Sequence, residues 1–254
     1  MTADQYVNAI VEKHRLPDTL DNYTSIYVVS PLKKIISNWA GACLCETKLS
    51  GSRAKGTAID LSTDLDLFIS LSSTTRNSLE EIYNSLYNRM LEEQISVRKQ
   101  NVSIGVTYQG KKVDLVPAKR QGQYGNDHSL YRRKAGSWTK TNIDTHISRV
   151  RQSGRITEIT ALKIWRENHN LEFPSIYLEC FAIDSLYGRS LNAPADNIMH
   201  LLRDIRDNIQ TRRVIDPTNT NNILSEELTQ MEKKALSNAA QQSLLAPYWG
   251  EIIW

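Results

Sequence analysis

Residues 64–71, DLDLFISL, alternate strictly between two kinds of side chain. Leucine or isoleucine occupies every second position, and the positions between them hold Asp64, Asp66, Phe68 and Ser70. Because successive side chains of a β-strand point to opposite faces, the pattern predicts a strand with one buried face and two carboxylates on the other. Carboxylates that share a face repel each other, and a folded protein tolerates them when a cation lies between them. The segment therefore predicts a sheet and indicates a cation site on it.

Two further alternating segments, at 102–108 and 111–117, are separated by Gln109-Gly110 and predict a hairpin. Asp114 lies in the second of them. If that strand neighbours residues 64–71, Asp114 completes a cluster of three carboxylates. Such a cluster can hold two Mg²⁺ ions, which together clamp the attacking and leaving oxygens of an in-line phosphoryl displacement.

A turn at Gly51-Ser52 precedes Asp64 by 13 residues. Such a turn presents backbone N–H groups and a hydroxyl to phosphate oxygens. On its own, an Asp-x-Asp pair more often marks a solvated strand face, and a Gly-Ser pair more often marks a plain turn. Their combination with a third aspartate in a later apolar strand favours a nucleotide site.

Helical spacing of apolar residues dominates the second half of the chain. We therefore expect a mixed strand-and-helix catalytic domain over residues 1–138 and a helical domain over residues 139–254. The predicted helices cover 4–15, a stretch that begins at Pro31, 77–93, 142–151, 155–169, 174–187, 194–210 and 222–245.

Charge and cysteine content argue against several classes of protein. With 31 basic and 28 acidic residues the net charge is only +3, so stable binding to nucleic acid is not expected. The three cysteines do not suggest a disulfide framework, the N-terminus lacks an apolar core of signal-peptide length, and no apolar run is long enough to span a membrane. A cytoplasmic protein without a membrane partner is the expectation.

The segments GSRAKGTAIDLSTDLDLFISL (51–71) and VDLVPA (113–118) resemble the fingerprint of the DNA polymerase β-like nucleotidyltransferase superfamily. The likeness is greatest to the group of oligoadenylate synthases, class I CCA-adding enzymes and the bacterial CD-NTases related to cyclic GMP-AMP synthase. This resemblance implies an α+β fold: a polymerase β-like core, with a mixed sheet and helices, packed against a C-terminal helical lobe. It also implies an active site in the cleft between them.

The resemblance further implies roles for individual residues. Gly51 and Ser52 would hold the donor triphosphate, and Asp64 and Asp66 would bind both metal ions. Asp114 would be the third metal ligand and would help to deprotonate the attacking hydroxyl. Thr63 departs mildly from the family pattern, since many members have serine there.

Residues 161–183, ALKIWRENHNLEFPSIYLECFAI, resemble the second core domain of the same family. That likeness implies that Lys163 and Ser175 contact the phosphates of the nucleotide. From the residues alone, Lys163 is as readily a solvated helical lysine and Ser175 a plain helix cap after Pro174. The basic run at 131–134 has two possible interpretations: a solvated loop or a contact to phosphate.

The expected protein is an enzyme that uses two Mg²⁺ ions, with Mn²⁺ as an acceptable substitute. It would join nucleoside triphosphates into a cyclic or short linear oligonucleotide second messenger and release pyrophosphate, in bacterial anti-phage signalling. A regulatory or effector protein partner would fit that role.

Three alternatives stay open at this point. The first is nucleotide addition to an RNA 3′ end, of the CCA-adding or poly(A) type, although little chain remains after the core to hold tRNA. The second is nucleotide transfer to a protein or a small molecule. The third is a catalytically inactive nucleotide-binding module, against which the presence of all three carboxylates argues.

Overall fold

The computed structural model describes residues 1–62 and 64–254, so the departure noted at Thr63 lies outside the described residues. Contacts group the chain into two units. The sheet unit comprises Pro17–Lys55 and Thr63–Ile147, and the helical unit comprises Met1–Leu16, Gly56–Ser62 and Ser148–Trp254. The division into domains 1–138 and 139–254 stays a prediction, because a contact grouping does not define what folds independently.

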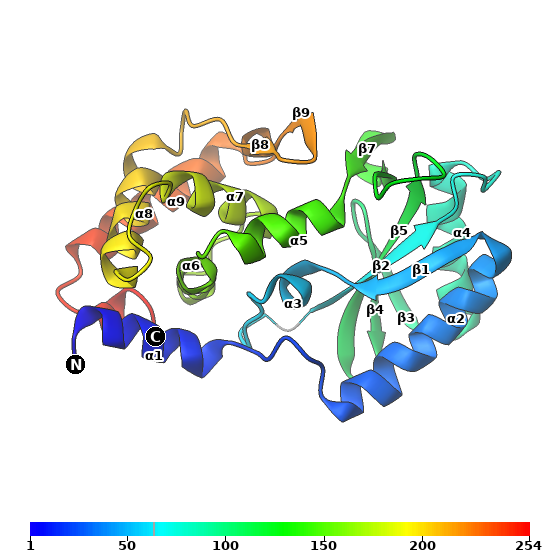
Figure 1. Ribbon diagram of the computed structural model, residues 1–254, viewed down its shortest axis with the longest axis horizontal. Coiled ribbons are helices and arrows are strands. Elements are labelled where there is room, and N and C mark those ends of the chain that lie inside the picture. The colour runs from blue at the N-terminus through cyan, green and yellow to red at the C-terminus, as the bar shows by residue number, and fades with distance from the viewer. Residues whose placement is uncertain (63) are drawn as a thin grey trace. The chain divides into compact units, whose positions relative to one another are not determined.

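The sheet unit is built on one mixed sheet (Figure 1). Its strands follow the order β1-β2-β5-β4-β3, and β6 pairs with β5 and with β7. The β2–β5 pair is parallel, whereas the other pairs are antiparallel. The strands are β1 (Leu44–Leu49), β2 (Leu65–Leu71), β3 (Ser96–Lys99), β4 (Ile104–Tyr108), β5 (Lys111–Arg120), β6 (His128–Arg132) and β7 (Ser137–Thr141).

The predicted hairpin is present as β4 and β5. Gln109 and Gly110 join the two strands with φ angles of +49° and +72°. A two-residue turn with both φ values positive matches the right-handed twist of the flanking strands, which explains why a glycine stands at the second position.

The apolar face of β2 is covered by helices α2 (Ser30–Ala40) and α4 (Leu79–Glu92), which run alongside the sheet in Figure 1. This confirms the predicted alternation, because the leucine and isoleucine positions of β2 are buried in this core. The opposite face carries the polar positions. The core beneath the helices contains Leu32, Ile36, Leu65, Leu67, Ile69, Leu71, Leu86, Ile104, Val113 and Leu115.

The helical unit has its own core around Trp165, Tyr177 and Phe181, each at most 1% exposed. A short two-stranded sheet, β8 (Ile215–Asp216) with β9 (Asn219–Ile223), completes it. The principal helices are α1 (Ala3–His14), α6 (Ile156–Asn168), α7 (Ser175–Ser185), α8 (Pro194–Asn208) and α9 (Gln230–Leu245), and α5 (Ile143–Gln152) begins in the sheet unit.

Two expectations need correction. The helix predicted over 222–245 begins only at Gln230, because residues 219–223 pair as β9 and Thr229 caps the helix together with Glu232. The helix predicted from Pro31 starts one residue earlier and follows a π-helix over Thr24–Val29. In addition, the strands β3, β6, β7, β8 and β9 were not predicted.

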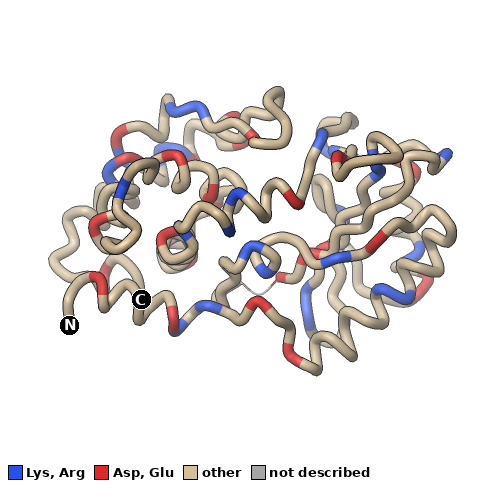
Figure 2. Tube along the Cα trace, in the orientation of Figure 1, with Lys and Arg blue, Asp and Glu red and all other residues tan. Residues whose placement is uncertain are grey.

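Charge is mixed along both units: Figure 2 shows basic and acidic segments interspersed on each trace. This agrees with the small net charge of +3. Among the helices of residues 1–62 and 64–254, none combines the length and the apolar character needed to cross a bilayer.

Candidate active site

Two of the predicted carboxylates are direct neighbours on the sheet. Asp66 on β2 and Asp114 on β5 are register partners in the parallel pair. Adjacent strands lie about 4.8 Å apart and paired residues project to the same face, so the two carboxylates stand side by side. Asp64 lies one residue before β2, and its negative charge acts on Asp114. The condition set by the sequence, that the Asp114 strand neighbours the Asp64–Asp66 strand, is met.

Asp114 is the carboxylate of this group whose ionised form is disfavoured by its surroundings. Burial raises the pKa of Asp114, and the negative charge of Asp64 raises it further. A hydrogen bond from Nε2 of Gln100 at 3.0 Å and the charge of Arg98 act in the opposite direction, as does the hydroxyl of Ser103. A half-buried carboxylate beside a second negative charge is the environment that a divalent cation relieves.

The chemistry of the donor set suits a hard cation, because carboxylate oxygens are the protein ligands that Mg²⁺ prefers. Within residues 1–62 and 64–254, no group of three or more Asp, Glu, His or Cys side chains is arranged as a ready-made metal site. The raised pKa of Asp114 favours the binding of a cation beside this carboxylate.

The glycine turn touches the carboxylate pair. The N–H of Ser50 donates to the carbonyl oxygen of Asp66 at 2.9 Å. Gly51 follows with a φ of +59°, and a β-carbon on Gly51 would stand 1.7 Å from Oδ2 of Asp66. Only glycine fits this close approach. The turn predicted at Gly51-Ser52 is the start of a short helix, α3 (Gly51–Lys55), in which Ser52 is half-buried.

Lys163 lies on α6 in the helical unit and is only 2% exposed. Its Nζ donates to Oγ1 of Thr57 at 2.9 Å and lies 3.3 Å from a carboxylate oxygen of Glu179, which is fully buried. Thr57 belongs to the 56–62 segment of the same unit. Lys163 is therefore not a solvated helical lysine. Its role as a phosphate contact stays a prediction.

Ser175 is the first residue of α7 and follows Pro174, as the sequence predicted for a helix start. Its Oγ accepts a hydrogen bond from Nη1 of Arg166 at 3.1 Å. The guanidinium of Arg166 also donates to the carbonyl oxygen of Phe173 and lies over its ring. Arg166 thus holds the start of α7 in place, and its presence beside Ser175 was not foreseen.

Three side chains around Asp114 were also missed: Arg98, Gln100 and Ser103. Arg98 lies on β3, a strand of four residues whose alternation is too short to stand out in the sequence. Gln100 and Ser103 lie in the loop that joins β3 to β4. Only the pairing of the strands shows that this loop returns to the carboxylates.

No family model matches the chain. Among curated proteins the chain is similar to the cyclic AMP-AMP-AMP synthase of Escherichia coli (strain MS 115-1), with 24% identity over 196 residues. The match covers 72% of this chain and 57% of that relative, so the chain spans little more than half the relative's length.

Solved structures share the architecture at low sequence identity. CdnC of E. coli MS115-1, in a complex with HORMA-deltaN, has a TM-score of 0.75 at 20% identity, covering 94% of this chain and 89% of that chain. The CD-NTase CdnG of Bradyrhizobium diazoefficiens, in complex with GTP, has a TM-score of 0.78 at 12% identity, covering 96% and 90%. The expected α+β fold is confirmed, because the chain shares the architecture of CdnC and of the CD-NTase CdnG.

Proposed function

We propose that the protein is a nucleotidyltransferase that joins nucleoside triphosphates into a cyclic or short linear oligonucleotide and releases pyrophosphate. The observation that carries this proposal is the pairing of Asp66 with Asp114 on one sheet face, with the backbone of Gly51 against Asp66. Two adjacent carboxylates can hold the metal ions of a phosphoryl transfer, and the backbone N–H groups of a glycine turn can bind phosphate oxygens.

In the proposed reaction, a ribose hydroxyl attacks the α-phosphorus of a bound triphosphate. A bond forms between the hydroxyl oxygen and the α-phosphorus. The bond between the α-phosphorus and the oxygen that bridges it to the β-phosphorus breaks, and pyrophosphate leaves with that electron pair. Asp114 takes the proton of the attacking hydroxyl, since its burial makes it a better proton acceptor than a solvated carboxylate. Gly51 and Ser52 bind the phosphates of the donor, and Lys163 and Ser175 contact phosphate oxygens as the family resemblance implies.

Asp64, Asp66 and Asp114 would hold two Mg²⁺ ions, for which Mn²⁺ would substitute. When bound, these ions supply charge neutralisation at the α-phosphate and at the leaving pyrophosphate. The protein's own contribution is to fix the two substrates in line, which is worth as much as about 7–11 kcal/mol of barrier for well-oriented reactants.

The relatives support an oligonucleotide product. One is named for a cyclic AMP-AMP-AMP product, and another was solved with GTP bound. We extend this to the present chain as a proposal, together with a role in bacterial anti-phage signalling. The complex of CdnC with HORMA-deltaN supports a regulatory protein partner for this chain as well.

The test is turnover with defined nucleotides. The protein is incubated with α-labelled ATP, GTP, CTP and UTP and Mg²⁺, pyrophosphate release is measured, and products are identified by mass spectrometry. We expect pyrophosphate together with an oligonucleotide that is either cyclic, and therefore resistant to phosphatase, or short and linear. The Asp66→Asn variant should form neither pyrophosphate nor oligonucleotide. Asp196→Asn is the matched control, because Asp196 is exposed on α8 and outside the candidate site.

Three outcomes would contradict the proposed function or its site. If the wild-type protein binds nucleotide but releases no pyrophosphate with any nucleotide or metal ion, the inactive-module alternative is correct. If Asp66→Asn forms product at the wild-type rate, the site assignment is wrong. Products that grow only on an added RNA 3′ end would instead favour the RNA-addition alternative.

A further inference from the structure

A row of paired residues crosses four strands of the sheet through the carboxylate site. Asp66 pairs with Asp114, Asp114 pairs with Gly105 on β4, and Gly105 pairs with Arg98 on β3. Because directly paired residues project to the same face, the row runs from a carboxylate on β2 to a guanidinium on β3. Asp114 stands between them.

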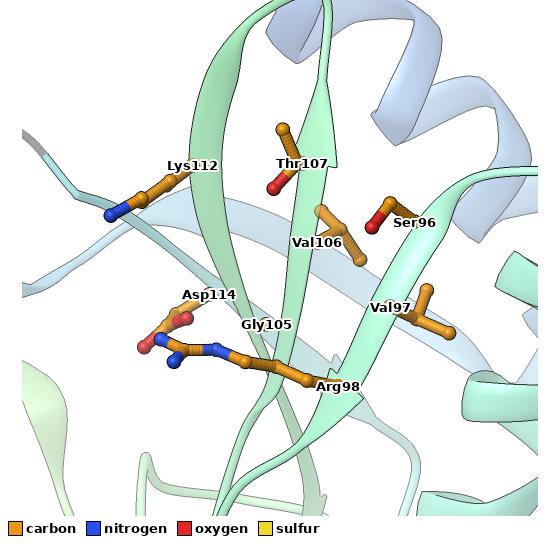
Figure 3. A pocket seen from close by; sticks show the side chains of 8 residues that line it. All are labelled: Ser96, Val97, Arg98, Gly105, Val106, Thr107, Lys112 and Asp114. Carbon is orange, nitrogen blue, oxygen red and sulfur yellow. The ribbon is translucent and has the colours of Figure 1, made fainter.

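Because Gly105 has no side chain, Arg98 can extend across β4 toward Asp114. A β-carbon on Gly105 would stand 2.9 Å from Nε of Arg98 and 2.9 Å from Nε2 of Gln100. A β-carbon at this position would make the ends of these two side chains shift. Figure 3 shows Arg98 lying across β4 at Gly105 with its guanidinium turned toward Asp114. The glycine therefore leaves room for Arg98 to lie across β4 in this position.

A second row lies two residues further along the strands. Ser96 pairs with Thr107, and Thr107 pairs with Lys112. Two residues correspond to about 6.6 Å along a strand, and this row shares the face of the first. All three side chains are exposed and carry a hydroxyl or an ammonium group.

The two rows line a cavity of about 200 Å³. Its walls include Arg98, Lys112, Ser96, Thr107 and one side of Asp114, and every lining residue comes from β3, β4 or β5 (Figure 3). The proposed donor position at Gly51 and Asp66 belongs to α3 and β2. The cavity therefore lies on the other side of Asp114 from the donor turn.

The lining chemistry suits a phosphate group. A guanidinium forms paired, charge-assisted hydrogen bonds with two phosphate oxygens, an ammonium supplies a second positive charge, and hydroxyls donate to the remaining oxygens. A volume of about 200 Å³ is below the range of about 300–1,000 Å³ typical of sites for whole ligands, so only part of a nucleotide fits.

We propose that this cavity binds a phosphate of the substrate that supplies the attacking hydroxyl, with Arg98 and Lys112 as its charged ligands. The inference rests on the proposed nucleotidyl transfer. Under this inference the acceptor, which is the substrate that supplies the attacking hydroxyl, is a phosphorylated nucleotide or oligonucleotide. A neutral hydroxyl compound is excluded as the acceptor. Asp114 stands between the two phosphate positions, where the hydroxyl of such an acceptor would face the donor.

The first test is binding and needs no turnover. Inorganic phosphate is titrated into protein held in EDTA, and the Nε–H resonances of the arginine side chains are followed by NMR. We expect a saturable shift of the Arg98 resonance. The affinity should fall at least tenfold in Arg98→Gln and several-fold in Lys112→Gln, and it should be unchanged in Lys111→Gln. Lys111 is the matched control because it neighbours Lys112 on β5 but points to the opposite face.

The second test is acceptor choice during turnover. Labelled triphosphates are offered with either nucleosides or nucleoside 5′-monophosphates as competing acceptors. The wild-type protein and Lys111→Gln should extend the monophosphates at least tenfold better, and Arg98→Gln should lose this preference. Arg98→Lys should recover only part of it, because lysine does not form the paired hydrogen bonds.

The outcomes separate this inference from the proposed function. Wild-type turnover with equal use of both acceptors, or an Arg98 resonance that does not respond to phosphate, overturns the phosphate subsite alone. Absence of any pyrophosphate release overturns the proposed function, while the titration in EDTA still decides whether the cavity binds phosphate.

Discussion

The backbone of Gly51 lies so close to Asp66 that a β-carbon on the glycine would stand 1.7 Å from Oδ2 of the carboxylate. The position combines this contact with a φ of +59°, which L-residues other than glycine rarely adopt. The Gly51-Ser52 turn and the Asp66 carboxylate are thus in direct contact within the sheet unit.

Substitution of Gly51 by alanine should therefore abolish activity by moving Asp66. A displacement of about 1 Å costs about 10²-fold in rate for a positioned group, so we expect pyrophosphate release to fall by at least that factor. Gly136→Ala is the control, because Gly136 has a φ of +55° but open space around its β-carbon position. Gly136→Ala should lose about 1–2 kcal/mol of stability and Gly51→Ala at least as much, and only Gly51→Ala should lose turnover. Equal activity in the two would show that the contact has no function.

When no metal ion is present, ionised Asp114 should lower the stability of the folded protein. Because burial and the charge of Asp64 raise its pKa, the folded protein holds the proton more tightly than the unfolded chain. Its ionisation therefore costs stability, and the loss grows as the pH rises through the folded-state pKa. In EDTA at pH 7, Asp114→Asn should melt at a higher temperature than the wild type.

Addition of Mg²⁺ should reverse that order. The wild-type melting temperature should rise with Mg²⁺, since a ligand that binds only the folded state stabilises it, and that of Asp114→Asn should rise much less. Differential scanning fluorimetry in EDTA and in Mg²⁺ measures both. A variant that is less stable than the wild type in EDTA would contradict the electrostatic account.

The parts of the fold with a local periodic signal could be predicted from the sequence. The two faces of residues 64–71 follow from alternation alone, and the hairpin follows from alternation around Gln109-Gly110. The pairing of Asp66 with Asp114 depended on an assumption about which strands are neighbours, because a parallel pairing leaves no mark in either strand.

The remaining features depend on contacts between distant residues. Nothing in the four residues of β3 shows that Arg98 crosses a glycine on the next strand to reach Asp114. The last two residues of β9, Asn222 and Ile223, were taken for the start of a helix, since the strand NTNNI has no apolar alternation. The burial of Lys163 against Glu179, 16 residues later on another helix, likewise arises only from packing.

His128 should make stability depend on pH. Burial lowers its pKa, and its ring is held neutral: Nδ1 donates to the carbonyl oxygen of Asn126 at 2.8 Å, and Nε2 lies 2.8 Å from Oγ of Ser70. Oγ of Ser70 in turn accepts from Nε of Arg120, which leaves its own proton for Nε2. Protonation would therefore place an extra hydrogen where a donor already points.

The direction of the pH effect follows from the lowered pKa of His128. As the pH falls below the unfolded-state value of about 6.5, the unfolded chain gains a proton that the folded protein does not, so stability is lost down to the folded-state pKa. His128→Gln keeps the shape without titrating. The stability difference between wild type and variant should shrink between pH 7.5 and pH 5 in urea denaturation. A constant difference would mean that His128 does not titrate in this range.

Removal of Lys163 should destabilise the helical unit through Glu179. Lys163→Met leaves a fully buried carboxylate without its ammonium partner, and loss of one member of such a pair costs about 3–5 kcal/mol. The double variant Lys163→Met/Glu179→Gln removes the charge as well and should regain most of this free energy of unfolding in urea. Thr57→Val removes only the hydroxyl that Lys163 bonds and should cost about 1 kcal/mol. The folded double variant then tests the phosphate contact: it should bind nucleoside triphosphate more weakly than the wild type, and wild-type affinity would show that Lys163 is purely structural.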